Sequence, residues 1–61
     1  MPVVIIENWE GPTVEQKRAV VQDITAALNK HLGTNPANLH IIFHDSRLDN
    51  WGRGGKLASD P

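Results

Sequence analysis

The chain contains no cysteine and no tyrosine, and its 61 residues include one phenylalanine and two tryptophans. Without cysteine it has neither a disulfide framework nor a thiolate metal site. Its net charge of −1, with both signs interspersed, gives no electrostatic reason to expect nucleic acid or an anionic membrane as a partner. No apolar run approaches the roughly 20 residues of a membrane span, and no signal peptide is visible. We therefore expect a cytoplasmic protein.

The short length predicts a single domain over residues 1–61. A chain of this size buries only about 60% of the surface that its unfolded form exposes, so a monomer has little stability. Because disulfides are excluded, oligomerisation is the usual remaining support for so small a scaffold. We therefore expect an obligate oligomer.

The first element is predicted over residues 3–8. This segment begins with the β-branched run VVII, which is too short for a helix, and it is followed by the sequence EGP. Such a run predicts a strand that is buried on both faces, and strands of this kind favour parallel pairing.

A long helix is predicted next, from Val14 to Leu32. Thr13 is a suitable N-cap and Gln16 its capping-box partner, while Gly33 is a suitable C-terminal stop. Apolar residues recur at three- and four-residue spacing, which predicts one buried stripe. The stripe comprises Val20, Val21, Ile24, Ala27, Leu28 and Leu32.

A second strand is predicted over residues 39–45, with the sequence LHIIFHD. Its side chains alternate, with Leu39, Ile41 and Phe43 on one face and His40, Ile42 and His44 on the other. Strand, helix and strand form a β-α-β unit with parallel strands and a right-handed crossover. The helix covers one sheet face, and the other face needs partner subunits.

The C-terminal tail is predicted to form a short hairpin or an arm that reaches a neighbouring subunit, because glycine occurs at positions 52, 54 and 55. The expected fold is thus of the α/β (α+β) class, a β-α-β protomer with parallel strands and a short C-terminal hairpin.

Pro2 stands directly before the first strand, where a proline is structurally permitted. A proline at this position also allows a chemical interpretation. Methionine is usually trimmed before a small second residue, which would leave Pro2 with a free secondary amine. An ordinary α-amino group has a pKa of about 7.7–8.0, and burial or a nearby cation lowers it. A base near neutrality suits proton abstraction next to a carbonyl and return at another carbon, a reaction without a cofactor.

Three parts of the sequence together resemble the 4-oxalocrotonate tautomerase family. They are the start MP before an apolar strand, the segment EGPTVEQKRAVVQDITAAL and the segment NWGRGGKLASD, which cover nearly the whole chain. The resemblance implies a hexamer, usually a trimer of dimers. It also implies an isomerase in which Pro2 acts as general base on a small unsaturated 2-hydroxy or 2-oxo acid.

The resemblance also implies positions for substrate binding. In the family's prototype an arginine before the helix and another at the start of the second strand bind the substrate, and an aromatic residue in the tail keeps the proline dry. These positions fall on Pro12, His40 and Trp51 here. Pro12 offers no donor, whereas neutral His40 donates one hydrogen bond, so only the aromatic residue is kept.

Other side chains are candidates to supply the positive charge that Pro12 and neutral His40 do not provide. Arg53 lies between glycines where the prototype is apolar, and Arg47 lies nearer the second strand. Either can supply a relocated cation, and either can instead be a solvated or ion-paired surface arginine. Trp9 can narrow the pocket or stack on an unsaturated substrate, and it can instead be an interface anchor.

Two further hypotheses about the function stay open. On the same fold, Glu7, Asp45 or Asp49 can activate water for hydration or dehalogenation of a 3-haloacrylate. Alternatively the chain is a catalytically silent subunit. A metal site is not expected, because His40 and His44 lie about 13 Å apart along one strand, too far to share an ion.

Overall fold

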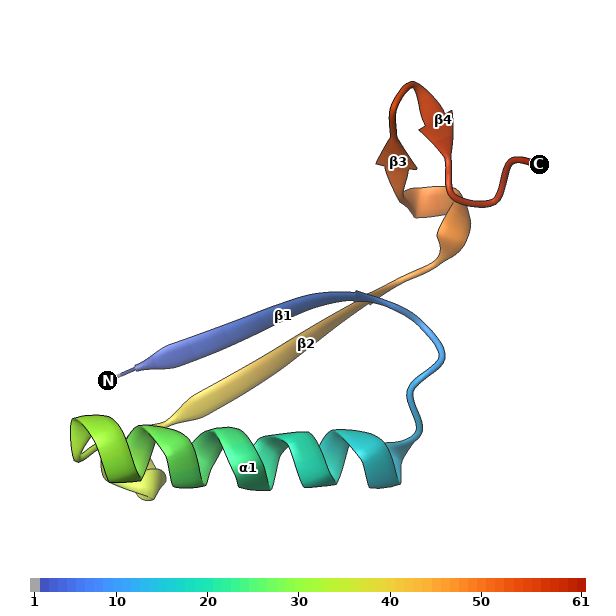
Figure 1. The fold of residues 1–61 in the computed structure, drawn as a ribbon. Helices are drawn as coiled ribbons and strands as arrows, with labels where there is room; N and C mark the ends of the chain where they lie inside the picture. Colours follow the sequence, from blue (N-terminus) through green and yellow to red (C-terminus); the bar gives the residue numbers. More distant parts are fainter. Residues whose placement is uncertain (1) are drawn as a thin grey trace.

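The computed structural model describes residues 2–61, so the expectation about Met1 removal lies outside it. The main elements are the strands β1 (Val3–Trp9) and β2 (His40–Ser46) and the helix α1 (Val14–Leu32) (Figure 1). The tail contains the short strands β3 (Gly52–Arg53) and β4 (Lys56–Leu57). Two short 3-10 helices, η1 (Pro36–Asn38) and η2 (Leu48–Asn50), lie before and after β2. The predicted helix bounds are confirmed. The first strand ends one residue later than predicted, and the second strand both begins and ends one residue later.

The helix ends are fixed by the predicted caps. Thr13 Oγ accepts a hydrogen bond from the Gln16 N–H at 3.1 Å, and Gln16 Oε1 accepts one from the Thr13 N–H at 2.9 Å. Gly33 has a φ of 67°, a left-handed conformation that suits glycine, and its N–H donates to the Asn29 carbonyl at 3.0 Å. Both signals are local, which explains why the sequence located the helix so closely.

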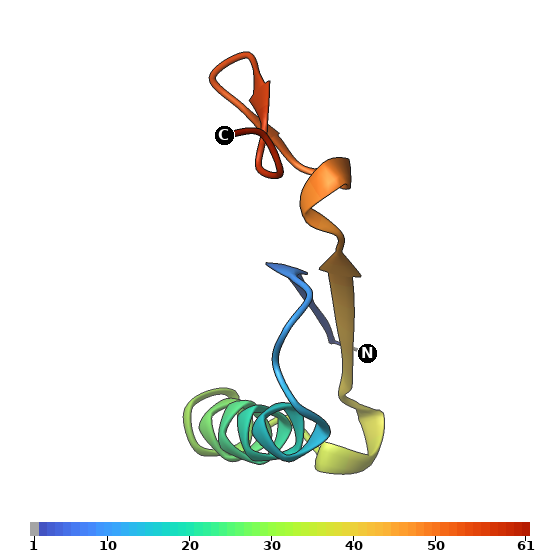
Figure 2. The same ribbon diagram turned by 90° about the vertical axis from the view of Figure 1, so that its right-hand side faces the viewer.

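Strands β1 and β2 pair in parallel, in a register that runs from Val3 opposite His40 to Trp9 opposite Ser46. The predicted β-α-β unit is therefore confirmed. Helix α1 lies against one face of this two-stranded sheet (Figures 1 and 2). Lys17 of α1 forms an ion pair with Asp45 and lies 5.6 Å from the centre of the Phe43 ring, which joins the start of the helix to the end of β2.

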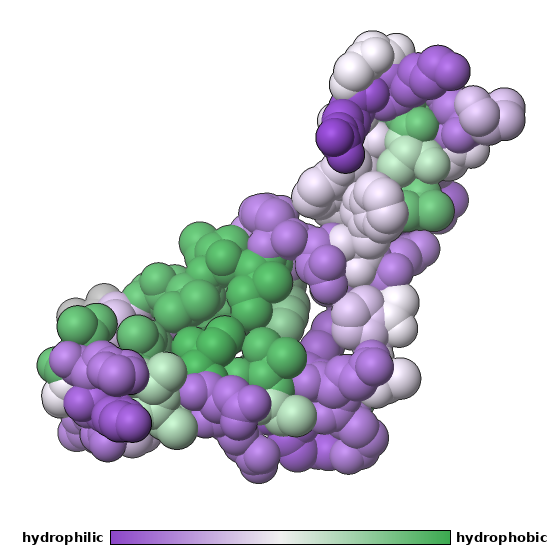
Figure 3. All heavy atoms as spheres, in the orientation of Figure 1, coloured by the Kyte–Doolittle hydropathy of each residue, from purple (hydrophilic) through white to green (hydrophobic). Residues whose placement is uncertain are grey.

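The helix-facing residues of the sheet are half-buried, whereas the opposite face is open. That open face exposes 47% of Val3, 55% of Ile5 and 42% of Ile42. The prediction that residues 3–8 are buried on both faces is therefore wrong for the single chain. Because only one helix is available, only alternate residues of β1 are covered. Apolar surface gathers over the strands in Figure 3.

The predicted helix stripe is only partly correct. Val21, Ile24 and Leu28 are half-buried, but Val20, Ala27 and Leu32 are exposed, and Leu32 is 72% exposed. A two-stranded sheet is too narrow to cover the whole apolar arc of the helix. Among residues 2–61 not one is fully buried, so this chain has no closed hydrophobic core of its own.

The tail forms the predicted hairpin, with β3 and β4 paired antiparallel. Its turn uses Gly54 and Gly55, whose φ angles of 60° and 82° are left-handed. The hairpin projects beyond the end of the sheet (Figures 1 and 2), and the chain measures 44 × 23 × 15 Å. Within residues 2–61, no helix has both the length and the apolar character needed to cross a membrane.

Candidate active site

Pro2 and His40 meet at one end of the sheet. Pro2 is half-buried, and its carbonyl accepts a hydrogen bond from the His40 N–H at 3.2 Å. The His40 side chain belongs to the exposed set of β2 and stands opposite Val3, so it lies on the open face. The structure therefore places His40 beside Pro2.

Trp9 and Trp51 meet at the other end of the sheet. Their rings pack edge to face, with centroids 6.0 Å apart and an angle of 85° between the planes. Trp9 is 48% exposed and Trp51 is half-buried. Arg53 follows Trp51 by two residues, in β3. Two aromatic rings and one cation are thus gathered where the hairpin leaves the sheet.

These two groups are far apart in one chain. Trp9 lies seven positions after Pro2 in the sequence, and a strand rises about 3.3 Å per residue, so roughly 23 Å lies between them. The hairpin that carries Trp51 and Arg53 extends further still (Figure 1). A single chain therefore does not bring Pro2 together with Trp9, Trp51 or Arg53.

Pro12 is half-buried and directly precedes the helix cap, near the Trp9 end of the sheet. It has no N–H to offer a ligand. Arg47 is already engaged, because its Nε and NH2 groups donate to the two carboxylate oxygens of Asp49, each at 3.0 Å. Of the two arginines considered as relocated cations, Arg47 therefore already binds a carboxylate of its own chain.

The acidic candidates are also engaged. Glu7 and His44 stand opposite each other in the β1–β2 register, and the Glu7 Oε1 lies 2.6 Å from the His44 Nδ1. Asp45 is ion-paired with Lys17, and Asp49 with Arg47. In residues 2–61, no group of three or more histidine, cysteine or acidic side chains is arranged to hold a metal ion.

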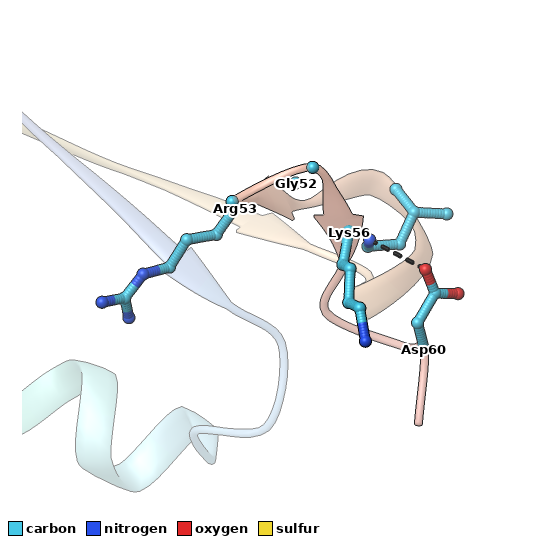
Figure 4. Close-up of a pocket in the computed structure, with 7 residues that line it drawn as sticks. Gly52, Arg53, Lys56 and Asp60 are labelled. Carbon is cyan, nitrogen blue, oxygen red and sulfur yellow. Dashed lines mark hydrogen bonds between the residues drawn. The ribbon is translucent and has the colours of Figure 1, made fainter.

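One residue with potential function was missed by sequence reasoning. Lys56 stands directly opposite Arg53 across the hairpin, and both line a hollow of about 360 Å³ on its surface (Figure 4). The remaining lining comes from Gly52, Gly54, Gly55, Leu57 and Asp60. The sequence GRGGK held the signal, because a two-residue glycine turn places the residues that flank it opposite each other.

Comparison with known proteins supports a single family. The family model described as tautomerase enzyme matches residues 2–60. A probable tautomerase of Halalkalibacterium halodurans is 38% identical over 60 residues, which cover 98% of each chain. The 2-hydroxymuconate tautomerase of Comamonas testosteroni is 38% identical over 60 residues, covering 98% of this chain and 95% of that protein.

Solved structures agree with this result. The crystal structure of a 4-oxalocrotonate tautomerase homologue superposes with a TM-score of 0.93 at 33% sequence identity. The match covers 100% of this chain and 97% of the homologue. The fold, including the hairpin that projects from the sheet, is therefore shared along the whole chain.

Proposed function

Because this chain belongs to the tautomerase family and is an isomerase, we propose that it is a cofactor-independent tautomerase acting in the cytoplasm with Pro2 as its general base. Its proposed substrate is a small unsaturated 2-hydroxy acid, which it converts to the 2-oxo form. The observation that carries the proposal is the half-buried Pro2 at the head of β1, whose carbonyl accepts the backbone N–H of His40.

The proposed reaction moves one proton. The Pro2 nitrogen, freed by removal of Met1, takes the proton of the enol hydroxyl, and the resulting enolate keeps the electron pair. The protonated amine then returns the proton to a carbon of the conjugated system, which leaves a ketone. The nitrogen of Pro2 must be a free amine for this step, because an amide nitrogen has no basic electron pair.

His40 is proposed to bind the substrate next to the base. A neutral imidazole donates one hydrogen bond, which suits the hydroxyl or keto oxygen where negative charge develops. The position of His40 on the open face keeps its ring free of the helix. An adjacent subunit is therefore able to enclose this end of the sheet without displacing any packed side chain.

The remaining binding residues are proposed to come from neighbouring copies of the chain in a homohexamer, a trimer of dimers. Trp51 would keep the amine dry, Trp9 would pack on the unsaturated part of the substrate, and Arg53 would meet its carboxylate. The distance of roughly 23 Å between Pro2 and Trp9 in one chain supports this arrangement. The open apolar face and the lack of any fully buried residue among residues 2–61 support it as well.

Nothing in the site favours hydration or dehalogenation. A carboxylate that activates water must be available to accept its proton. Glu7 is held by His44 and Asp45 by Lys17. The tautomerase reaction needs neither carboxylate, so it agrees better with the observed contacts of Glu7 and Asp45.

The decisive experiment compares Pro2 variants with matched controls. The preparation is first confirmed by intact mass to begin at Pro2, and ketonisation of 2-hydroxymuconate and phenylenolpyruvate is then measured. Pro2→Ala is expected to lower kcat/KM by about 100-fold or more, the usual contribution of a general base. Pro61→Ala, at the exposed end of the chain, is the matched control.

A second variant separates the amine from the ring. An uncleaved N-terminal extension converts the Pro2 nitrogen to an amide without changing any side chain, and it is expected to abolish ketonisation. Full activity of the extended protein would show that the Pro2 nitrogen is not the base. A protein that begins at Pro2 and ketonises neither substrate would exclude the proposed activity on acids of this class.

A further inference from the structure

Two cations of the hairpin stand out when the basic side chains are compared. Lys17, Arg18 and Arg47 form ion pairs with Asp45, Glu15 and Asp49. Lys30 lies in the last turn of α1, where a positive charge is favourable against the helix dipole. Among residues 2–61, Arg53 and Lys56 are the two basic residues left with neither an acidic partner nor a helix-end role.

The residues that carry these two cations are paired in the backbone of the hairpin, while their side chains extend in different directions (Figure 4). Arg53 and Lys56 are direct partners in the antiparallel register of β3 and β4. Like charges directly opposite each other destabilise a strand pair. The two strands have two residues each, and a short isolated hairpin is marginally stable in any case. If these two positions served stability alone, a pair of opposite charges or of uncharged side chains would stabilise the hairpin more.

One acid, Asp60, is among the residues that line the same hollow as Arg53 and Lys56. Asp60 Oδ2 accepts a hydrogen bond from the Leu57 N–H at 3.1 Å, and no ion pair joins Asp60 to either cation. In Figure 4, the Arg53 side chain reaches away from Asp60. The positive charge of the hairpin is therefore available to an anion from outside the chain.

We propose that Arg53 and Lys56 form a two-cation clamp for the carboxylate end of the substrate, which selects a monocarboxylic 2-oxo or 2-hydroxy acid with an apolar unsaturated tail. This inference rests on the proposed function and names its substrate class. Lys56 is the residue that it adds to the site.

The chemistry of the clamp fits such an acid. The guanidinium of Arg53 offers a planar fork that matches both oxygens of one carboxylate, and Lys56 adds a second, compact positive charge on the same hairpin. Gly52, Gly54 and Gly55 present no side chains that would block the approach, and no atom lies within 4 Å of the position of a Cβ at Gly54 or Gly55. The pair of Trp9 and Trp51 at the hairpin base offers an apolar surface for the tail of the acid.

The clamp accounts for only one carboxylate. At the opposite end of the sheet, Pro2 is accompanied by His40, and Pro12 contributes no donor at the helix entrance. A second carboxylate would thus meet no arginine at either place. The same reasoning predicts that a dicarboxylate binds no more tightly than a monocarboxylate of equal length.

The test measures binding, so that it does not depend on turnover. Phenylpyruvate and its methyl ester differ in the negative charge and in one methyl group, and both are titrated against tryptophan fluorescence of the assembled protein. Arg53→Gln is expected to weaken binding of the acid by about tenfold or more, the effect of losing a charge-assisted hydrogen bond. It is expected to leave binding of the ester nearly unchanged, and Lys56→Gln is expected to act in the same direction.

Arg18→Gln is the matched control, because Arg18 is exposed and paired with Glu15 on α1. Equal weakening of acid and ester, or no weakening in either hairpin variant, would overturn the clamp. Native mass spectrometry verifies that each variant assembles. If Arg53→Gln does not assemble, Arg53→Lys and Lys56→Gln decide the question, since Arg53→Lys keeps the charge and removes only the fork.

The two proposals fail separately. If the N-terminally extended protein keeps full turnover while Arg53→Gln loses affinity for the acid alone, the base is wrongly assigned and the clamp stands. If ketonisation depends on Pro2 while acid and ester respond equally to Arg53→Gln, the base stands and the clamp is wrong.

Discussion

The indole of Trp9 meets the indole of Trp51 edge to face, with ring centroids 6.0 Å apart. Trp9 ends β1, whereas Trp51 directly precedes the hairpin strand β3. The contact therefore links the sheet to the base of the hairpin and helps to set the direction in which the hairpin projects. Aromatic pairs of this geometry contribute about 0.5–1.5 kcal/mol beyond the area that they bury.

Replacement of Trp9 is expected to disturb the hairpin while the β-α-β unit persists. In Trp9→Ala, the contact is lost, so kcat/KM should fall because Arg53 and Trp51 are no longer held in place. Trp9→Phe keeps an aromatic edge and is expected to retain most of the activity. Circular dichroism supplies an independent readout, since the signal of two coupled indoles should vanish in both variants. An unchanged kcat/KM in Trp9→Ala would contradict this positioning role.

The open sheet face is expected to be the assembly interface. Ile42 stands opposite Ile5 in the middle of this face, and the two are 42% and 55% exposed. Ile42→Asp would place a charge in a covered apolar contact, which costs far more than the same change in water. We predict that the variant dissociates to a smaller species in sedimentation velocity.

Gln22→Asp, on the exposed side of α1, is the control for added negative charge, and it should keep the native mass. If Ile42→Asp assembles as the unmodified protein does, this face is not an interface. The location of the interface would then have to be sought elsewhere on the chain.

The helix cap predicts a defined loss of stability. Thr13→Ala removes the oxygen that accepts the Gln16 N–H, and an N-cap replacement of this type lowers the free energy of unfolding by about 1 kcal/mol per chain. Thr13→Ser keeps the oxygen and should stay close to the unmodified protein. Urea unfolding at one fixed protein concentration measures both, because assembly makes the midpoint depend on concentration. Equal midpoints for the alanine and serine variants would show that the cap contributes nothing.

Removal of the Asp45 carboxylate separates the isomerase from a hydrolytic reaction. Asp45 is ion-paired with Lys17, and the proposed reaction does not use its carboxylate, so Asp45→Asn should change ketonisation by less than about fivefold, the rate equivalent of about 1 kcal/mol. We expect no halide release from 3-haloacrylates by either protein. Halide release that disappears in Asp45→Asn would instead assign this carboxylate to water activation.

Local chemistry explains what could be predicted from the sequence. The helix bounds follow from Thr13, Gln16 and Gly33, which act within a few residues of the backbone groups that they satisfy. The alternation of His40, Ile41 and Ile42 likewise fixes which residues share a face of β2. These features need no knowledge of the rest of the fold.

Burial was harder to predict, because it depends on what lies opposite. Val20 and Leu32 match the helical period but remain exposed, since the two-stranded sheet covers only part of the apolar arc. The sequence allowed Arg47 to be ion-paired, but it did not identify Asp49 as its partner or Glu7 as the partner of His44. These contacts give partners to acidic and basic side chains that composition alone would count as free.

The sequence by itself determined the order of the main elements, the bounds of the helix, the parallel β-α-β unit and the family, because each depends on short-range patterns or on motifs in a fixed order. Only the tertiary structure decided which site residues lie at each end of the sheet. It places His40 beside Pro2 and gathers Trp9, Trp51 and Arg53 roughly 23 Å or more away, since a strand is stiff and separates its two ends. It also sets Lys56 opposite Arg53, because a two-residue turn folds the tail back on itself.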